Sequence, residues 1–210
     1  MSDTSGLFFP TQVMRRVLDG AWVAATPSED GDATDAALMM VPTSIAYTGT
    51  SATLTASGSV EFTACSSLSL NGVFSADYDN YMIVHRANAS APDNVSFKFR
   101  QSGTDSSTGY TQQLLTANST NVTGSRSTTV AVNVSAVYGT QRAGFVLNVY
   151  GPFLSQPTAM RSAAILDFDS AAIRDTAATH SVVDSYDGFT TYMGGQNMTG
   201  LVSVYGIRGA

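Results

Sequence analysis

The fold of this chain is decided by residues 70–110, which read LNGVFSADYDNYMIVHRANASAPDNVSFKFRQSGTDSSTGY. At their centre an unbroken apolar run, YMIV at residues 81–84, follows the turn-forming segment DYDN at residues 77–80. A short run of β-branched and aromatic residues bounded by turn residues is typical of a strand buried on both faces. We therefore expect residues 81–84 to form a central strand.

The next segment, residues 95–100, alternates strictly between apolar and polar residues. Its sequence VSFKFR places Val95, Phe97 and Phe99 on one face and the polar residues on the other. This pattern predicts a half-buried strand with one face in water. Two glycines and an aspartate in the following segment, residues 101–110, predict a turn-rich loop. Together these segments indicate the middle of a β-sandwich.

The same period of two continues through most of residues 38–210. Many short strands separated by regular turn signals predict an all-β, antiparallel β-sandwich or jelly-roll-like domain. One helical turn is expected at residues 171–175. The expected core includes Phe97, Phe99, Val132, Val134, Phe145 and Leu147. The expected strands are residues 38–41, 44–48, 52–56, 59–70, 80–87, 94–100, 110–116, 128–137, 144–150, 162–168, 179–186, 189–193 and 201–207.

Residues 1–37 differ from the rest and are expected to form a short N-terminal attachment arm and an acidic linker. The arm carries Phe8, Phe9 and Trp22, which we expect to insert into a neighbouring subunit. The alternative is that these rings cover one end of the domain's own core. The acidic segment at residues 27–35 does not have the spacing of an EF-hand loop and is expected to be a solvated turn.

Composition limits the partners of the chain. Its 210 residues carry a net charge of −6, and only 12% are charged, with Lys98 the one lysine. This balance argues against nucleic acid, whose phosphates are bound by Lys and Arg. Neutral polar strand faces lose little free energy on desolvation, so a cyclic homo-oligomer is expected.

No signal peptide or membrane-spanning run is evident in the sequence. The single cysteine, Cys65, is expected to be buried.

Three segments carry a resemblance to a known class of proteins. The segment FSADYDNYMIV at residues 74–84, the segment FRQSGTD at residues 99–105 and the closing GLVSVYG at residues 200–206 resemble a module of tailed-bacteriophage virion structural proteins. The resemblance covers residues 59–208. It implies a fibre or capsid-decoration component, and analogy with phage appendages makes a trimer the expected oligomer.

Few residues suit catalysis. His85 and His180 have no cysteine or third histidine nearby in sequence, so each is expected to be structural. Nucleophile-elbow, phosphate-loop and dinucleotide-binding motifs are absent from the sequence. The carboxylate pairs Asp167/Asp169 and Asp184/Asp187 are expected to cap turns. For Asp167 and Asp169, which would share one strand face, a cation bound between subunits is the alternative. We therefore expect no catalytic residues, cofactor or enzymatic activity.

Four tyrosines are the remaining functional candidates: Tyr110, Tyr138, Tyr186 and Tyr192. They fall at expected strand ends or turns, where a ring can face solvent. Such rings can stack on sugar faces or anchor a subunit interface, and the interface is favoured here.

Two functions follow from these observations. The first is a non-enzymatic virion structural protein, assembled in the bacterial host cytoplasm, that self-associates and docks on the capsid or tail. The alternative is a receptor-binding module of a tail appendage that binds a host surface glycan.

Overall fold

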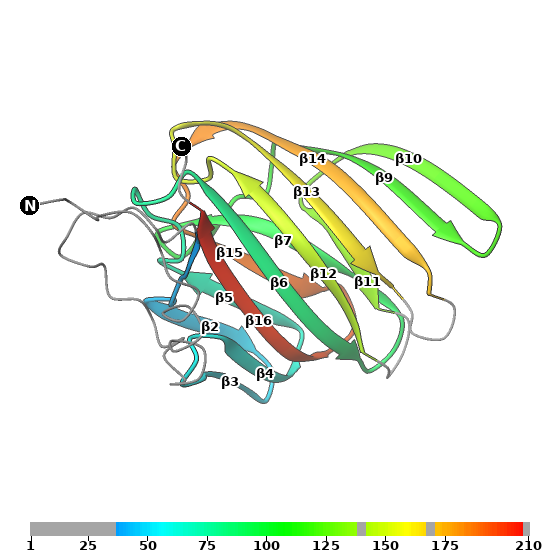
Figure 1. Ribbon diagram of the computed structural model, residues 1–210, viewed down its shortest axis with the longest axis horizontal. Helices are drawn as coiled ribbons and strands as arrows, with labels where there is room; N and C mark the ends of the chain where they lie inside the picture. Colours follow the sequence, from blue (N-terminus) through cyan, green and yellow to red (C-terminus); the bar gives the residue numbers. More distant parts are fainter. Residues whose placement is uncertain (1–36, 138–141, 167–170, 208–210) are drawn as a thin grey trace, which may run out of the picture. The chain divides into compact units, whose positions relative to one another are not determined.

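A computed structural model of the chain describes residues 37–137, 142–166 and 171–207 (Figure 1). The chain divides into two compact units, residues 1–38 and residues 39–210. The short strand β1 (Ala37–Met39) spans their boundary. The second unit is an all-β sandwich of two antiparallel sheets, as expected, and no helix occurs among the described residues.

The larger sheet forms one side of the sandwich, and the strands along its main path pair antiparallel (Figure 1). Strand β1 pairs with β16 beside this path. Its order is β10 (Asn121–Thr129), β9 (Tyr110–Asn118), β14 (Ile173–Asp184), β13 (Gln156–Ile165), β12 (Ala143–Tyr150), β6 (Asn80–Ala89), β16 (Met198–Ile207), β4 (Val60–Cys65) and β3 (Ser51–Leu54).

The smaller sheet packs on the other side of the core. Its order is β11 (Val132–Val137), β7 (Asp93–Gln101), β15 (Gly188–Met193), β5 (Ser67–Asn71) and β2 (Ser44–Thr48), with β8 (Thr104–Asp105) paired to β7.

Strand β6 lies between β12 and β16 in the larger sheet, so the central position expected for residues 81–84 is confirmed. The expectation that residues 81–84 are buried on both faces was wrong, however. Tyr81 and Ile83 point into the core, whereas Met82 is half-buried and Val84 is 36% exposed. The smaller sheet packs on only one face of β6, so its alternate residues face outward.

The core is aromatic at its centre, and Phe99 of β7 lies in the middle of it. The centroid of its ring lies 4.9 Å from that of Tyr186, 5.1 Å from that of Phe97 and 5.4 Å from that of His180. Because His180 belongs to the larger sheet, these contacts join the two layers. All six residues expected in the core, Phe97, Phe99, Val132, Val134, Phe145 and Leu147, are buried, as is Cys65.

Two expected strands are each divided between the two sheets. Residues 59–70 form β4 in the larger sheet and β5 in the smaller one, with the chain turning near Ala64 at a φ of 47°. Residues 128–137 likewise contain the end of β10 and the whole of β11. The period of two continues through both turns, so it gave no sign of either break. The helical turn expected at residues 171–175 was also wrong, because Ile173 begins β14.

A β-bulge in β11 is stabilised by side chains from the larger sheet. The register against β7 shifts between Asn133 and Ser135. The backbone N–H of Asn133 donates to Gln112 Oε1 over 2.8 Å, and Thr176 Oγ1 donates to the backbone carbonyl of Asn133 over 3.0 Å. Ser162 Oγ donates to the Val134 carbonyl over 2.7 Å. Polar residues of the core therefore satisfy the backbone groups that the bulge removes from the ladder.

Candidate functional site

One end of the outward face of the larger sheet is rich in apolar side chains, although it lies in solvent. We call it the apolar face; it extends over β6, β12, β13, β14, β9 and β10. Along these strands the outward positions alternate with core positions, as the pleat requires. Its apolar members are Val84, Gly144, Val146, Ala163, Ile165, Ile173, Leu115, Ala117, Val122 and Gly124. The charged residues Arg86 and Asp175 lie in the same cross-strand rows, and Arg161 and Arg126 lie in the next row.

Its larger side chains are strongly exposed. The exposed fraction is 55% for Ile165, 54% for Ile173, 50% for Leu115 and 71% for Val122. Single exposed apolar residues are common on soluble proteins, but a continuous group of them across several strands is typical of an interaction surface.

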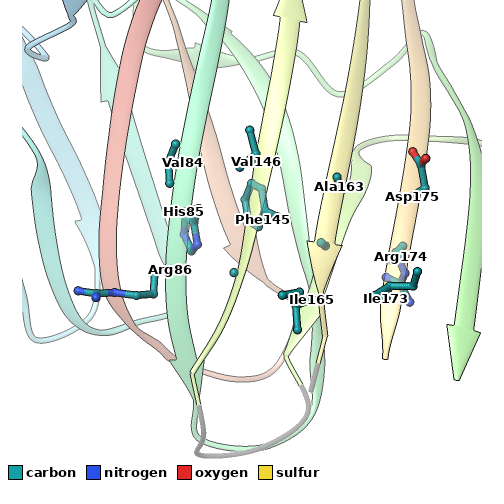
Figure 2. Close-up of a pocket in the computed structure, with 12 residues that line it drawn as sticks. Val84, His85, Arg86, Phe145, Val146, Ala163, Ile165, Ile173, Arg174 and Asp175 are labelled. Carbon is teal, nitrogen blue, oxygen red and sulfur yellow. The ribbon is translucent and has the colours of Figure 1, made fainter. Parts of the chain in front are cut away.

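A hollow of about 560 Å³ lies within this face, over β6, β12, β13 and β14. Figure 2 shows Ile165 and Ile173 at the same level on neighbouring strands, with Val84 and Val146 at another level. Small residues keep the space between them open. Gly144 stands opposite both Arg86 and Ile165, and a Cβ at Gly144 would lie only 3.0 Å from the His85 carbonyl oxygen.

Three charged residues line the hollow, namely Arg86, Arg174 and Asp175. Arg161 Nη2 and Asp175 Oδ2 lie 2.5 Å apart, and the hydrogen bond from Arg161 holds the pKa of the Asp175 carboxyl below its usual range. Arg86 lines the other side of the hollow. Covering this face with another apolar surface would desolvate Arg86 as well as the Arg161–Asp175 pair, although that pair would stay matched.

The outward face of the smaller sheet is polar. We call it the polar face; it carries a hollow of about 380 Å³ bounded by β5, β7, β8 and β15. At its floor Arg100 Nη1 contacts Asp105 Oδ1 at 2.5 Å and Thr190 Oγ1 at 3.0 Å. The two outer faces of the sandwich thus differ in kind.

The expected exposure of Tyr110 and Tyr186 was wrong. Both rings are buried in the core, at 0% and 2% exposure, and burial raises the pKa of each hydroxyl. The Tyr110 hydroxyl accepts a hydrogen bond from the Phe99 amide over 2.8 Å. Both rings stack on Phe99 and are part of the aromatic core, so they cannot contact a ligand.

Tyr192 is the one candidate tyrosine that the structure places at the surface. It is half-buried on the polar face, with Lys98 Nζ 5.3 Å from its ring centroid. Tyr138 and the arm residues Phe8, Phe9 and Trp22 lie outside the described residues, as do Asp167 and Asp169.

Both histidines are buried. His180 Nε2 lies 3.0 Å from Ser106 Oγ, and its ring packs against Tyr110 with centroids 4.3 Å apart. His85 stacks on Phe145 at 4.8 Å, and burial lowers its pKa to about 4. Such a histidine stays neutral at physiological pH.

Asp184 and Asp187 hold turns. Asp184 Oδ1 accepts from Gln101 Nε2 over 2.6 Å, and Asp187 Oδ2 accepts from the Ser102 amide over 3.2 Å.

Within residues 37–137, 142–166 and 171–207, no three His, Cys, Asp or Glu side chains gather closely enough to hold a metal ion. None of the described residues form a helix that could cross a membrane.

The apolar face was not expected from the sequence, although a signal for it was present. Adjacent apolar pairs such as Leu114-Leu115 and Ala164-Ile165 place one apolar residue on each side of their strand. A strand with one wet face would carry a polar residue at the second position. The adjacent pairs therefore indicate that both faces are apolar.

No family model matches this chain, and no curated protein matches it. Two solved structures are similar over much of its length. A protein of unknown function from Shewanella oneidensis shares 9% identity, over 98% of this chain and 97% of that one, with a TM-score of 0.24. The binding domain of botulinum neurotoxin serotype G shares 8%, over 85% of this chain and 45% of that one, with a TM-score of 0.26. Scores this low carry no argument about function.

Proposed function

We propose that this chain is a non-enzymatic structural protein of a tailed-bacteriophage virion that self-associates through the apolar face. The observation that carries the proposal is the exposure of Ile165, Ile173, Leu115 and Val122 on one continuous sheet surface. A second copy of the chain is the partner that fits it best. Both surfaces would then present the same exposed apolar side chains, and each Asp175 carboxylate would keep Arg161 as its partner.

The segments that resemble phage structural proteins support the virion assignment, because their residues build the sandwich. Phe74 packs on Tyr81 with ring centroids 4.7 Å apart. The ring of Tyr78 lies against Gly206, where an added Cβ would come within 2.5 Å of it. The resemblance is thus carried by structural residues, as a fibre or decoration protein requires. Its analogy with phage appendages makes a trimer the proposed oligomer.

Attachment to the capsid or tail is the second element of the proposal. We assign it to residues 1–26, which carry Phe8, Phe9 and Trp22 and lie outside the described residues. Deleting residues 1–26 should leave a folded, oligomeric β domain that no longer joins particles. Normal occupancy of the truncated protein on virions would show that the arm is not the anchor. Failure to fold would assign the rings to the domain's own core.

Self-association is tested by sedimentation of the full chain and of variants with lysine on the apolar face. The proposal requires the parent protein to be oligomeric at micromolar concentration and the variants to dissociate. A monomeric parent protein would contradict it.

A further inference from the structure

The hollow on the polar face has no part in the proposed self-association, because it opens on the opposite side of the sandwich. It lies where β5, β7, β8 and β15 meet, and nearly all its outward side chains are polar. Its volume of about 380 Å³ lies in the range of small-molecule sites. The lining residues are Ser66, Ser67, Ser69, Lys98, Arg100, Asp105, Thr190, Tyr192 and Met193.

Arg100 is fixed at the floor of this hollow by the protein itself. Its Nε donates to Asn71 Oδ1 over 3.0 Å, and its Nη1 donates to Ser69 Oγ over 3.2 Å, in addition to the contacts with Asp105 and Thr190. Its Nη2 donates to the Gly103 carbonyl. The guanidinium is thus engaged along its whole edge and is 12% exposed, so it organises the hollow and leaves ligand contact to its neighbours.

Asp105 lines the hollow with a partly exposed carboxylate. Its Oδ1 accepts from Arg100 and, over 2.7 Å, from Thr190 Oγ1. No described residue donates a hydrogen bond to Oδ2, and the side chain is 29% exposed. Because Oδ1 is held from two sides, the orientation of Oδ2 is fixed before any ligand arrives. The result is a preorganised acceptor for a hydroxyl group.

Lys98 and Tyr192 form the wall beside it. Lys98 Nζ donates to Ser107 Oγ over 3.1 Å and lies near the ring of Tyr192. An ammonium has three donors, so it keeps capacity for a ligand oxygen. Tyr192 is half-buried and stands opposite Ser67 and Ser96 on the neighbouring strands. Lys98 Nζ lies over its ring, so only the remaining exposed part of the ring can contact a ligand.

We propose that this hollow is a carbohydrate-binding site that takes one neutral pyranose residue of a glycan. Asp105 Oδ2 accepts a hydrogen bond from one sugar hydroxyl, and Lys98 Nζ donates to a neighbouring hydroxyl oxygen. The exposed part of the Tyr192 ring contacts the apolar C–H face of the sugar. A ring, an acceptor and a donor within one small polar hollow match the alternating apolar and hydroxyl surfaces of a pyranose.

A free anion fits this hollow less well. The guanidinium of Arg100 is paired with Asp105, and the carboxylate of Asp105 lines the same hollow, where it repels an anion. Phosphate would also make no use of the Tyr192 ring. A neutral polyhydroxyl ligand satisfies the donor and the acceptor together.

The test is saturation-transfer difference NMR on the full chain, which detects weak ligands of large assemblies. The probes are the methyl pyranosides of glucose, galactose, mannose and N-acetylglucosamine, followed by an array of bacterial surface polysaccharides. We expect at least one of these sugars to receive saturation, most strongly at the C–H protons of one face. Absence of transfer to every pyranoside and of binding to every array member would overturn the proposal.

Two variants locate the site. Tyr192→Thr removes the ring and keeps a strand-compatible residue, and Asp105→Asn keeps an oxygen for Arg100 while converting Oδ2 into a donor. Each should weaken binding about tenfold or more. The matched control is Tyr150→Thr, because Tyr150 is 45% exposed on the other sheet. Circular dichroism confirms that each variant is folded.

Three results would contradict the site. Unchanged binding in folded Tyr192→Thr would place the sugar elsewhere, and equal loss in Tyr150→Thr would show a non-specific effect. Displacement of the sugar by sodium phosphate would make the hollow an anion site. Lysine at Ile165 and Ile173 should leave sugar binding by each subunit intact, so failure of this site and failure of the proposed self-association are separate outcomes.

Discussion

Ile165 of β13 and Ile173 of β14 stand directly opposite each other in the antiparallel register, and more than half of each side chain is exposed. Cross-strand apolar pairs stabilise a sheet, but this pair also presents its outer surface to water. Full burial of one such side chain contributes about 1.5–3 kcal/mol. A subunit contact over the apolar face would therefore stabilise an oligomer, to the extent that it exceeds the cost of association.

The bulge in β11 makes stability depend on Gln112, which is 4% exposed. Replacing Gln112 by leucine removes the Oε1 acceptor and leaves the backbone N–H of Asn133 without that partner. A buried donor without a partner costs about 1–3 kcal/mol. Urea unfolding of Gln112→Leu should show a loss of this size.

The matched control is Gln113→Leu, since Gln113 is the exposed neighbour on the same strand. Its effect should stay within about 0.5 kcal/mol, as is usual for surface positions. Equal losses in the two variants would mean that the bond to the bulge contributes nothing measurable.

Phe99 is the aromatic residue that joins the two layers. Phe99→Ala removes a ring that contacts both sheets and should lower the free energy of unfolding by about 3–5 kcal/mol, measured by urea unfolding. Phe99→Leu should lose less, because it leaves a smaller cavity. A loss below about 1 kcal/mol for the alanine variant would show that the core closes around the gap.

Two buried histidines predict that stability falls in mild acid. Burial lowers the pKa of His85 from 6.5 to about 4, and burial also lowers the pKa of His180. In the unfolded chain both imidazoles take up protons as the pH falls through about 6.5. The folded protein keeps His85 neutral until about pH 4. The contribution of the neutral His85 ring to the free energy of unfolding is therefore fully present above pH 6.5 and is lost as the pH falls toward 4.

For His85 this loss amounts to about 3 kcal/mol over that range. The control is His85→Leu, which removes one of the two groups and should show a weaker pH dependence between pH 6.5 and 4. The measurement is the free energy of unfolding of both proteins at several pH values. If it falls with pH equally in the parent protein and in His85→Leu, His85 does not have this role.

The sheet pattern of the fold was predictable because strand periodicity is local. Val95, Phe97 and Phe99 face the core as their alternation indicates. The division of residues 59–70 between two sheets was not predictable, because the alternation continues across the turn near Ala64. The hairpin formed by β9 and β10 was also missed, since β10 is exposed on both faces and has no apolar period.

The candidate sites depend on pairing, which the sequence does not contain. Ile165 and Ile173 belong to one surface only because β13 and β14 pair in this register. Tyr110 and Tyr186 were misassigned because a tyrosine at a strand end can turn inward when the core offers its hydroxyl a partner, as the Phe99 amide does for Tyr110. Lys98 and Tyr192 come together only through the pairing of β7 with β15.

The matched variants for the apolar face are the double change Ile165→Lys/Ile173→Lys and the single change Val130→Lys. Val130 is 57% exposed but lies between β10 and β11, outside the apolar face. The double variant sets two like charges opposite each other within the proposed interface, where their burial is unfavourable. It should remain folded, because both side chains already face solvent.

Sedimentation velocity of the full chain at micromolar concentration tests the central claim most directly. The account predicts one oligomeric species, a trimer, for the parent protein and for Val130→Lys, and a folded monomer for the double lysine variant. A parent protein that sediments as a monomer, or a double variant that remains as oligomeric as the parent, would contradict self-association through the apolar face.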